Sequence, residues 1–228
     1  MQLLLHIETA GQNCSVALSN EKGLIDCIEK NEANIHGSAL TVFIETLLAK
    51  NNFKPSDLKA VAVSKGPGSY TGLRIGVSAA KGLCYALNIP LIATDTLGSL
   101  ANMALSKITA KEKYLLCPML DARRMEVYTC LYDQDLNLIT EVSASIIDEN
   151  SFAEFRASQP IYFFGDGAEK CKPIFANDPH SFFIDSLYPS ASASIAAAHT
   201  KFEQNIFEDV AYFEPFYLKE FVAGPSKK

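Results

Sequence analysis

A glycine-rich segment at residues 66–72 (GPGSYTG) constrains the fold of this chain most strongly. It follows a short apolar run at residues 60–64 (AVAVS), which is typical of a strand buried on both faces of a sheet. It leads into residues 71–87, a helical pattern rich in small side chains. A strand, a glycine loop and a helix in this order predict an α/β protein with a mixed sheet.

The segments around this unit predict further strands and helices. Apolar or alternating runs between polar turns predict strands at residues 2–8, 13–19, 24–30, 60–64 and 90–94. A helix capped by Ser38 is expected to run to about Lys50, and a later helix, capped by Asp95 or Thr96, to Leu105. The apolar face of the first of these helices carries Leu40, Phe43, Ile44, Leu47 and Leu48.

A change of composition at residues 106–112 (SKITAKE) divides the chain into two predicted lobes. Residues 1–106 form the N-terminal lobe, which carries the partner-binding helices discussed below, and residues 107–228 form the C-terminal lobe. In the second lobe we expect strands at 114–120, 126–132, 138–142 and 161–164, and helices near 149–157, after Gly167 and at 191–203. This order roughly repeats that of the first lobe. Residues 224–228 (GPSKK) predict a disordered tail.

Composition excludes several classes of function. The net charge of −6 argues against a large basic surface for nucleic acids. The six cysteines include no CxxC pair and the four histidines no HxxxH pair, so we expect no metal site. No run reaches the roughly 18 apolar residues of a membrane span, and the first residues do not read as a signal peptide. We therefore expect a cytoplasmic protein without a membrane partner.

The glycine-rich segment has a functional and a structural interpretation. A helix N-terminus that follows a glycine loop offers backbone N–H groups to a phosphate. The segment lacks the Lys-Ser/Thr pair of a P-loop, and it lacks GxGxxG because position 71 is Thr. The alternative is a rigid strand-to-helix turn. The candidate residues of this structural or vestigial phosphate loop are Gly66, Pro67, Gly68, Ser69, Thr71 and Gly72.

Ser64 ends the 60–64 strand in a segment, AVSKG, that approximates a nucleophile elbow. Asp166 or Asp185 and then His199 follow in the chain order of an α/β-hydrolase, but no HGGG-type oxyanion motif is present. This disfavours a serine hydrolase. Asp166, between two glycines, is otherwise typical of a turn. His6, in an apolar strand, is expected to be a core or edge histidine rather than a metal ligand.

Asp121 and Arg123 lie between two expected strands. An Asp in a hairpin usually bonds to its own backbone, but here it could instead face a cleft between the lobes, where a carboxylate holds magnesium through water. Asp121, Arg123 and Glu8, at the end of the first strand, are the candidate cleft residues.

Several segments together resemble one family. They are residues 7–10 (IETA), 14–18 (CSVAL), 65–76 (KGPGSYTGLRIG), 121–128 (DARRMEVY) and 214–218 (EPFYL). On these motifs the chain resembles the TsaB (YeaZ) family, whose members serve the threonylcarbamoyladenosine modification of bacterial tRNA. The resemblance covers residues 3 to about 218 and is most specific at 65–76 and 121–128.

The resemblance implies an actin-like ATPase fold (ASKHA, ribonuclease H-like), with two lobes that each contain a mixed sheet and flanking helices. It implies a non-catalytic scaffold subunit that binds and supports a TsaD-like catalytic paralogue, alongside a TsaE-like ATPase. That paralogue transfers a threonylcarbamoyl group from threonylcarbamoyl-AMP to adenosine 37 of tRNAs reading ANN codons. The resemblance implies no cofactor for this chain, and tRNA contact only indirectly, through the complex.

The residues after the first strand agree with a non-catalytic role. Actin-like ATPases carry an Asp and a glycine-containing phosphate hairpin there, whereas this chain has Glu8 and a hairpin, residues 10–13 (AGQN), with one glycine. The longer arm of Glu8 would displace a magnesium-bound water, and catalytic geometry tolerates little displacement. We therefore expect no catalytic residue. The alternatives are an active ATPase or phosphotransferase of the same fold, or a glycoprotease-like peptidase.

The partner surface is expected on the 38–50 and 71–87 helices. Periodicity places small residues on one stripe of the second helix, but it does not show whether the stripe packs on the chain's own sheet or meets a partner. Val42 and Ala49, outside the apolar face of the first helix, favour a partner. In the resembled family these two helices pair with those of the catalytic paralogue, and an isolated homodimer would use the same surface through two-fold symmetry. The expected interface residues are Leu40, Phe43, Leu47, Gly72, Arg74, Gly76, Ala79, Ala80 and Leu83, with Glu45 and Lys81 also at the rim.

Overall fold

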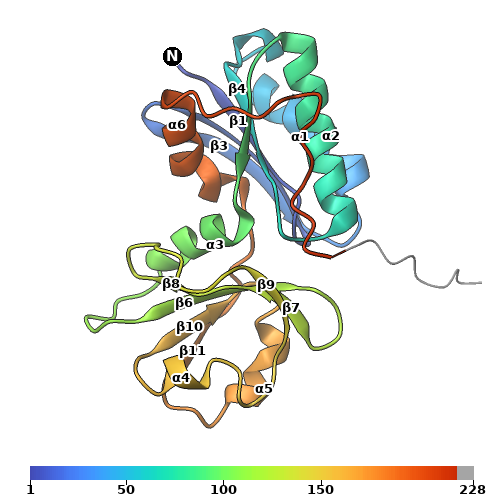
Figure 1. Ribbon diagram of the computed structural model, residues 1–228. Helices are drawn as coiled ribbons and strands as arrows, with labels where there is room; N and C mark the ends of the chain where they lie inside the picture. Colours follow the sequence, from blue (N-terminus) through green and yellow to red (C-terminus); the bar gives the residue numbers. More distant parts are fainter. Residues whose placement is uncertain (220–228) are drawn as a thin grey trace, which may run out of the picture.

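The computed structural model describes residues 1–219 and consists of two lobes, one above the other in Figure 1. The expected tail at 224–228 lies outside the described residues. The first lobe is built on a five-stranded sheet of order β3-β2-β1-β4-β5. Its strands are β1 (Leu4–Glu8), β2 (Asn13–Asn20), β3 (Gly23–Asn31), β4 (Ala60–Ser64) and β5 (Leu91–Thr94).

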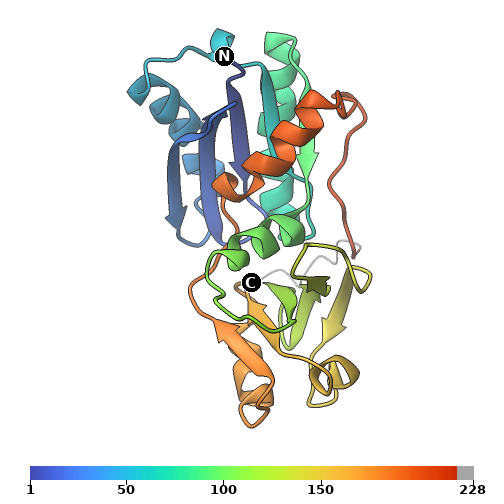
Figure 2. The same ribbon diagram turned by 90° about the vertical axis from the view of Figure 1, so that its left-hand side faces the viewer.

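The central strand β1 separates two apolar layers. It runs antiparallel to β2 and parallel to β4, and all of its residues are buried. Because side chains alternate along a strand, Leu5 and Ile7 face the layer beneath α1 (His36–Lys50) and α2 (Tyr70–Leu87). Leu4 faces the opposite layer beneath α6 (Ile195–Glu203), which lies across the sheet in Figure 2. Short 3-10 turns at Pro55–Asp57 and Ala191–Ser194 connect these elements.

The second lobe repeats the strand order of the first. Its sheet reads β9-β7-β6-β10-β11, with β6 antiparallel to β7 and parallel to β10, as β1 is to β2 and β4. The expected repetition of element order is thus present in the structure. The strands are β6 (Leu115–Asp121), β7 (Glu126–Thr129), β9 (Ser143–Ile146), β10 (Ile161–Phe164) and β11 (Ser181–Ile184), and the short β8 (Tyr132–Asp133) also pairs with β6.

Helices cover both faces of the second sheet. One face packs against Cys171 and Phe175, from a 3-10 turn at Glu169–Cys171 and α5 (Lys172–Phe175), and α4 (Ala153–Arg156) contributes Phe155 to the same cluster. The other face packs against α3 (Thr96–Leu105), through Leu97 and Leu100.

The lobes exchange their last helices, and this corrects the predicted boundary at residue 106. Helix α3 follows the last strand of the first sheet but packs on β6 of the second. Helix α6 follows the second sheet but packs on Leu4 and Ile92 of the first. The segment after α6 continues along the first lobe, where Phe213 joins the core beneath α1 and α2. The chain therefore crosses between the lobes before α3, ahead of the composition shift at 106–112, and crosses back before α6.

Local hydrogen bonds decide where the helices begin. Asp95 caps α3 as expected, because its carboxylate accepts from the Gly98 amide at 2.8 Å. Ser69 caps α2 and accepts from Gly72 N at 3.2 Å. The predicted cap at Ser38 is wrong: α1 begins at His36, and the Ser38 hydroxyl donates to the carbonyl of Ile35 from within the first turn.

The predicted strand at 138–142 is also wrong. The carboxylate of Asp133 accepts hydrogen bonds from the amides of Asp135 and Asn137, which closes a turn there. The chain then bends back onto Leu131, and the strand that pairs with β7 starts later, at Ser143. The strand β11 was not predicted.

Candidate functional site

A cleft of about 740 Å³ lies between the lobes. The first lobe contributes the turn after β1, the start of α1 and residues 68–72 at the start of α2. The second lobe contributes Asp121, Arg123 and Asp166, and Lys219 reaches the cleft from the C-terminal segment. The cleft therefore collects most of the polar groups that the sequence suggested as a site.

Glu8 does not line this cleft, which corrects its assignment as a cleft residue. Its side chain is buried beneath the turn, and its Oε1 accepts from Ala10 N at 2.6 Å and from the Ser64 hydroxyl at 2.8 Å. Burial raises the pKa of Glu8 to about 7, against the opposing effect of these hydrogen bonds. The carboxyl group is thus engaged in fixing the turn after β1 to the end of β4.

Asp121 and Arg123 do line the cleft, and they also shape the turn between β6 and β7. The Asp121 carboxylate accepts from Arg123 N at 3.0 Å and forms an ion pair with Lys170. Arg123 and Arg124 both have positive φ angles, +72° and +47°, so the turn is tight. The carboxylate that was suggested as a magnesium holder is therefore paired with a lysine.

The glycine-rich loop fixes the turn after β1 against the start of α2. An ideal Cβ at Gly68 would lie 2.5 Å from the carbonyl oxygen of Ala10, and Ser69 N donates to that oxygen at 2.7 Å. The glycine with positive φ in this loop is Gly66, at +108°. Of the candidate loop residues, Gly68, Ser69, Thr71 and Gly72 line the cleft, whereas Gly66 and Pro67 do not.

The small-residue stripe of α2 packs on the end of the chain's own first strand and the residue after it, which corrects its expected exposure. Gly72 and Gly76 meet Thr9 so closely that a Cβ would lie 2.1 and 2.2 Å from its oxygens. Ala80 is fully buried in the same core, as are Leu40 and Leu47 of α1. These five residues are therefore not available to contact a partner.

The C-terminal segment holds two of the expected rim residues. The Lys81 ammonium donates to the carbonyl oxygens of Ala211 and Phe213, both at 3.0 Å. Arg74 lies over the ring of Tyr70, 4.4 Å from its centroid, and is hydrogen-bonded to Tyr217. Residues 211–217 thus contact the outer side of α2, and the segment ends beside the cleft, where Lys219 pairs with Glu126 of the second lobe.

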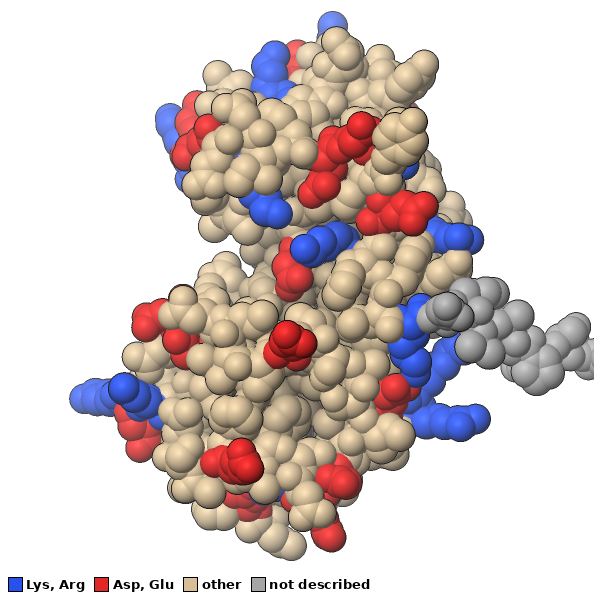
Figure 3. Space-filling model, in the orientation of Figure 1, with Lys and Arg blue, Asp and Glu red and all other residues tan. Residues whose placement is uncertain are grey.

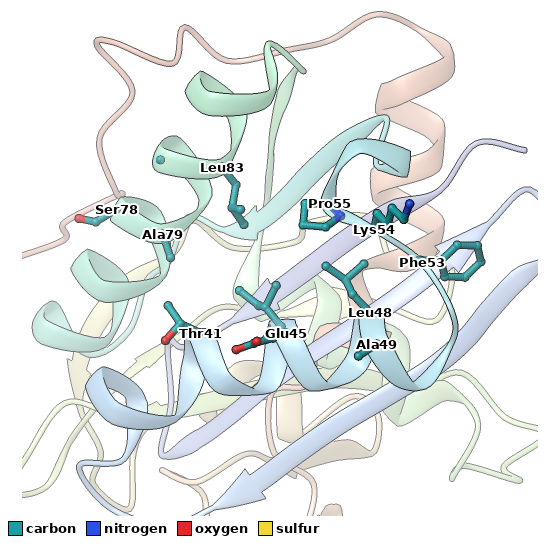
Figure 4. Close-up of a pocket in the computed structure, with 12 residues that line it drawn as sticks. Thr41, Glu45, Leu48, Ala49, Phe53, Lys54, Pro55, Ser78, Ala79 and Leu83 are labelled. Atoms are coloured by element: carbon teal, nitrogen blue, oxygen red, sulfur yellow. The ribbon is translucent and has the colours of Figure 1, made fainter.

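An apolar groove of about 510 Å³ lies between α1 and α2 (Figure 4). Its walls carry Thr41 and Glu45 from α1 and Ser78, Ala79 and Leu83 from α2, and residues 53–55 close one end. Of the nine expected interface residues, Ala79 and Leu83 line this groove, while Phe43 is half-buried against the core. Sequence periodicity identified the two helices correctly. Most of the residues it assigned to the interface, however, face the core of the first lobe and not the groove.

The residues of the hydrolase alternative are not assembled. Ser64 donates to Glu8, whereas His199 Nε2 lies 2.8 Å from the hydroxyl of Ser19. His6 is buried in the core as expected, between Ser19 at 2.7 Å and Ser194 at 3.1 Å. Within residues 1–219, no three His, Cys, Asp or Glu side chains are grouped as metal ligands, and no helix is long and apolar enough to cross a membrane.

Asp166 is a site residue that sequence reasoning missed. It was predicted as a turn residue, but its side chain lines the cleft and accepts from Asp121 N at 2.9 Å. The available signal was its position directly after a strand of the parallel part of the sheet, because the carboxyl ends of such strands border ligand clefts.

Two lobes with the same strand order around an interlobe cleft define an actin-like fold. The model of the TsaD family, described as tRNA N6-adenosine threonylcarbamoyltransferase, matches residues 30–224. Among curated proteins, tRNA threonylcarbamoyladenosine biosynthesis protein TsaB of Escherichia coli K12 is 34% identical over 225 residues, which cover 96% of each chain. TsaB of Bacillus subtilis 168 is 36% identical over 146 residues, which cover 61% of this chain and 58% of that protein.

The solved structure of YeaZ from Pseudomonas aeruginosa is 25% identical to this chain, with a TM-score of 0.82. The superposition covers 96% of this chain and all of that chain. The chain therefore belongs to the TsaB (YeaZ) family.

Proposed function

We propose that this chain is a non-catalytic scaffold subunit in threonylcarbamoyladenosine biosynthesis. In this role it supports a TsaD-like catalytic subunit that transfers a threonylcarbamoyl group to adenosine 37 of tRNAs reading ANN codons. The observation that carries the non-catalytic part is the position of Glu8, whose carboxyl is buried against Ser64 and Ala10 N and does not line the cleft. The match to the Escherichia coli TsaB protein along 96% of both chains supports the pathway.

The proposed partner surface is the groove between α1 and α2. It is an apolar hollow on the outer side of the first lobe, with Thr41, Glu45 and Ser78 exposed along it. Apolar hollows rimmed by polar side chains are typical of interaction sites. We assign this surface to the TsaD-like subunit, and to a second copy of this chain, related by two-fold symmetry, when the protein is isolated. A TsaE-like ATPase completes the proposed assembly.

The proposal gives tRNA only an indirect contact with this chain, within the complex. On the face shown in Figure 3, Asp and Glu side chains lie among the Lys and Arg side chains over both lobes. The acidic balance of the whole chain, −6, agrees with this, because phosphate contacts require many uncompensated cations. A cytoplasmic location belongs to the same proposal.

Reconstitution of the modification tests this function. The TsaD-like and TsaE-like proteins of the same cell are incubated with tRNA, ATP and threonylcarbamoyl-AMP, with and without this chain, and modified adenosine 37 is measured by mass spectrometry. We expect modification to require the chain and to survive Glu8→Gln, and we expect the chain alone to hydrolyse neither ATP nor peptides. Magnesium-dependent ATP turnover by the chain alone, lost in Asp121→Ala, would favour the ATPase alternative instead.

A further inference from the structure

A carboxylate of the second lobe contacts the backbone on both sides of the cleft. Asp166 follows β10, and its side chain accepts from the N–H of Asp121 in its own lobe at 2.9 Å. Its Oδ2 also lies against the backbone of the first-lobe turn, 3.3 Å from an ideal Cβ on Gly11, where the N–H of Gln12 favours the charged carboxylate. A single half-buried side chain thus joins the two lobes at the cleft.

The first lobe is shaped to admit this carboxylate. An ideal Cβ at Gly11 would lie 3.3 Å from Asp166 Oδ2 and 3.5 Å from Cδ of Pro189. A contact of 3.3 Å is tighter than a Cβ normally tolerates. The one glycine that the hairpin keeps therefore stands where Asp166 approaches the backbone.

The amide of Gln12 lies in a part of the cleft suited to an anion. The turn at residues 10–12 lines the same cavity as residues 68–72, at the N-terminus of the 18-residue helix α2. Backbone N–H groups in a turn after a strand and at a helix N-terminus both favour negative charge. The negative group in contact with the turn is the carboxylate of Asp166, supplied by the opposite lobe.

We propose that Asp166 is a built-in anion that occupies the phosphate position of the first-lobe turn and locks the two lobes together. The lock fixes the angle between the lobes and keeps inorganic phosphate and phosphate-bearing ligands away from the Gln12 amide. It goes beyond the proposed partner role, because it concerns the cleft and not the groove between α1 and α2.

Two further observations support the lock. Burial raises the pKa of the Asp166 carboxyl, and the hydrogen bond from Asp121 N opposes this, so the amides offset part of the cost of burying the carboxylate. Within residues 1–219, the ion pair between Lys219 of the C-terminal segment and Glu126 of the second lobe joins side chains that are 46% and 22% exposed, and such pairs contribute little.

Asp166→Ala tests the lock in the full-length protein. We expect the radius of gyration, measured by small-angle X-ray scattering, to increase as the lobes separate. Exchange of the Gln12 amide, followed by NMR, should become about tenfold faster, because a hydrogen bond to a charged acceptor is lost. Millimolar inorganic phosphate should reverse both changes in the variant and have no effect on the wild type, because it refills the vacated anion position.

Controls separate the lock from general loss of structure. Asp185→Ala removes an exposed carboxylate of the same lobe that pairs with Lys172, away from the cleft lining, and it should leave both readouts unchanged. Gly11→Ala should open the lobes from the other side of the contact, and phosphate should not restore it because Asp166 is still present. Wild-type scattering and Gln12 exchange in Asp166→Ala would overturn the lock. Equal rescue by phosphate and by chloride at the same ionic strength would overturn the anion assignment.

Discussion

The backbone of α2 meets the turn after the first strand at Gly72, where an ideal Cβ would lie 2.1 Å from the carbonyl oxygen of Thr9. The same helix approaches Thr9 again one turn later, at Gly76, where the distance to Oγ1 would be 2.2 Å. Glycine at these positions lets the helix lie directly on the turn that forms one wall of the cleft. The small residues in α2 are therefore explained by its close contact with Thr9, and their spacing does not indicate a partner.

Gly72→Ala should lower the free energy of unfolding by roughly 1–3 kcal/mol, because a methyl group has to displace backbone. Gly82→Ala, in the same helix, should raise it by about 0.5–1 kcal/mol, since nothing lies within 4 Å of the new Cβ and alanine favours helix. Urea unfolding of both variants measures the difference. Similar effects of the two substitutions would contradict this account of the stripe.

Glu8 and His6 give the stability opposite dependences on pH. Burial raises the pKa of Glu8 to about 7, so its contribution falls as the pH rises from about 4.5 to 7. Burial, with a smaller effect of His199, lowers the pKa of His6 to about 3, so its contribution falls as the pH drops below 6.5. Between pH 4.5 and 6.5 the two slopes oppose each other in the wild type.

Glu8→Gln should leave only the pH dependence of the unfolding free energy that comes from His6. The variant is expected to lose about 1 kcal/mol of stability per pH unit on acidification from pH 6.5 to 4.5, while the wild type stays nearly flat. Urea unfolding at several pH values measures the slope, with the exposed Glu45→Gln as control. A Glu8→Gln profile that runs parallel to the wild type would show that Glu8 titrates normally.

The segment after α6 should stabilise the first lobe through Phe213 and not through its neighbour Tyr212. Phe213 packs against the core beneath α1 and α2, whereas Tyr212 is 84% exposed. Phe213→Ala should therefore cost roughly 1–2 kcal/mol of stability, about what half-burial of such a ring contributes. Tyr212→Ala should cost less than about 0.5 kcal/mol. Thermal unfolding measures the stability of both variants. Equal losses would mean that packing of Phe213 beneath α1 and α2 does not stabilise the first lobe.

Patterns within one element were predictable from the sequence, because they depend on local spacing. The strands of the first sheet, the length of α2 and the cap at Asp95 follow from alternation, helical periodicity and a side chain that bonds two or three residues away. The actin-like fold and the family came from the motifs and not from these patterns. Periodicity alone leaves several orders of the strands open.

Contacts between distant segments were not predictable. Nothing in the 191–203 helix indicates that it covers the first sheet, because an apolar face does not identify its partner. The burial of Glu8 depends on Ser64, 56 positions away, and the role of Asp166 depends on Gln12 in the other lobe. The sequence therefore predicted which loops border the cleft. It did not predict that Glu8 is buried beneath one of them or that Asp166 contacts the other lobe.

The groove between α1 and α2 leads to a prediction about assembly. Thr41 and Thr46 are both exposed threonines of α1, but Thr41 lines the groove and Thr46 does not. Thr41→Arg should place a charge and a long side chain in the hollow and reduce binding of the TsaD-like protein at least about tenfold, since an unpaired charge in an apolar contact is costly. It should also disrupt self-association. Ala80→Arg is unsuitable for this purpose, because Ala80 is buried.

Thr46→Arg is the matched control and should leave binding unchanged, because it adds the same charge to the same helix outside the groove. Calorimetric titration with the TsaD-like protein measures the affinity, and sedimentation velocity measures self-association. Both variants should melt within a few degrees of the wild type, since neither residue is in the core. Unchanged affinity in Thr41→Arg, or equal losses in both variants, would move the interface away from the groove.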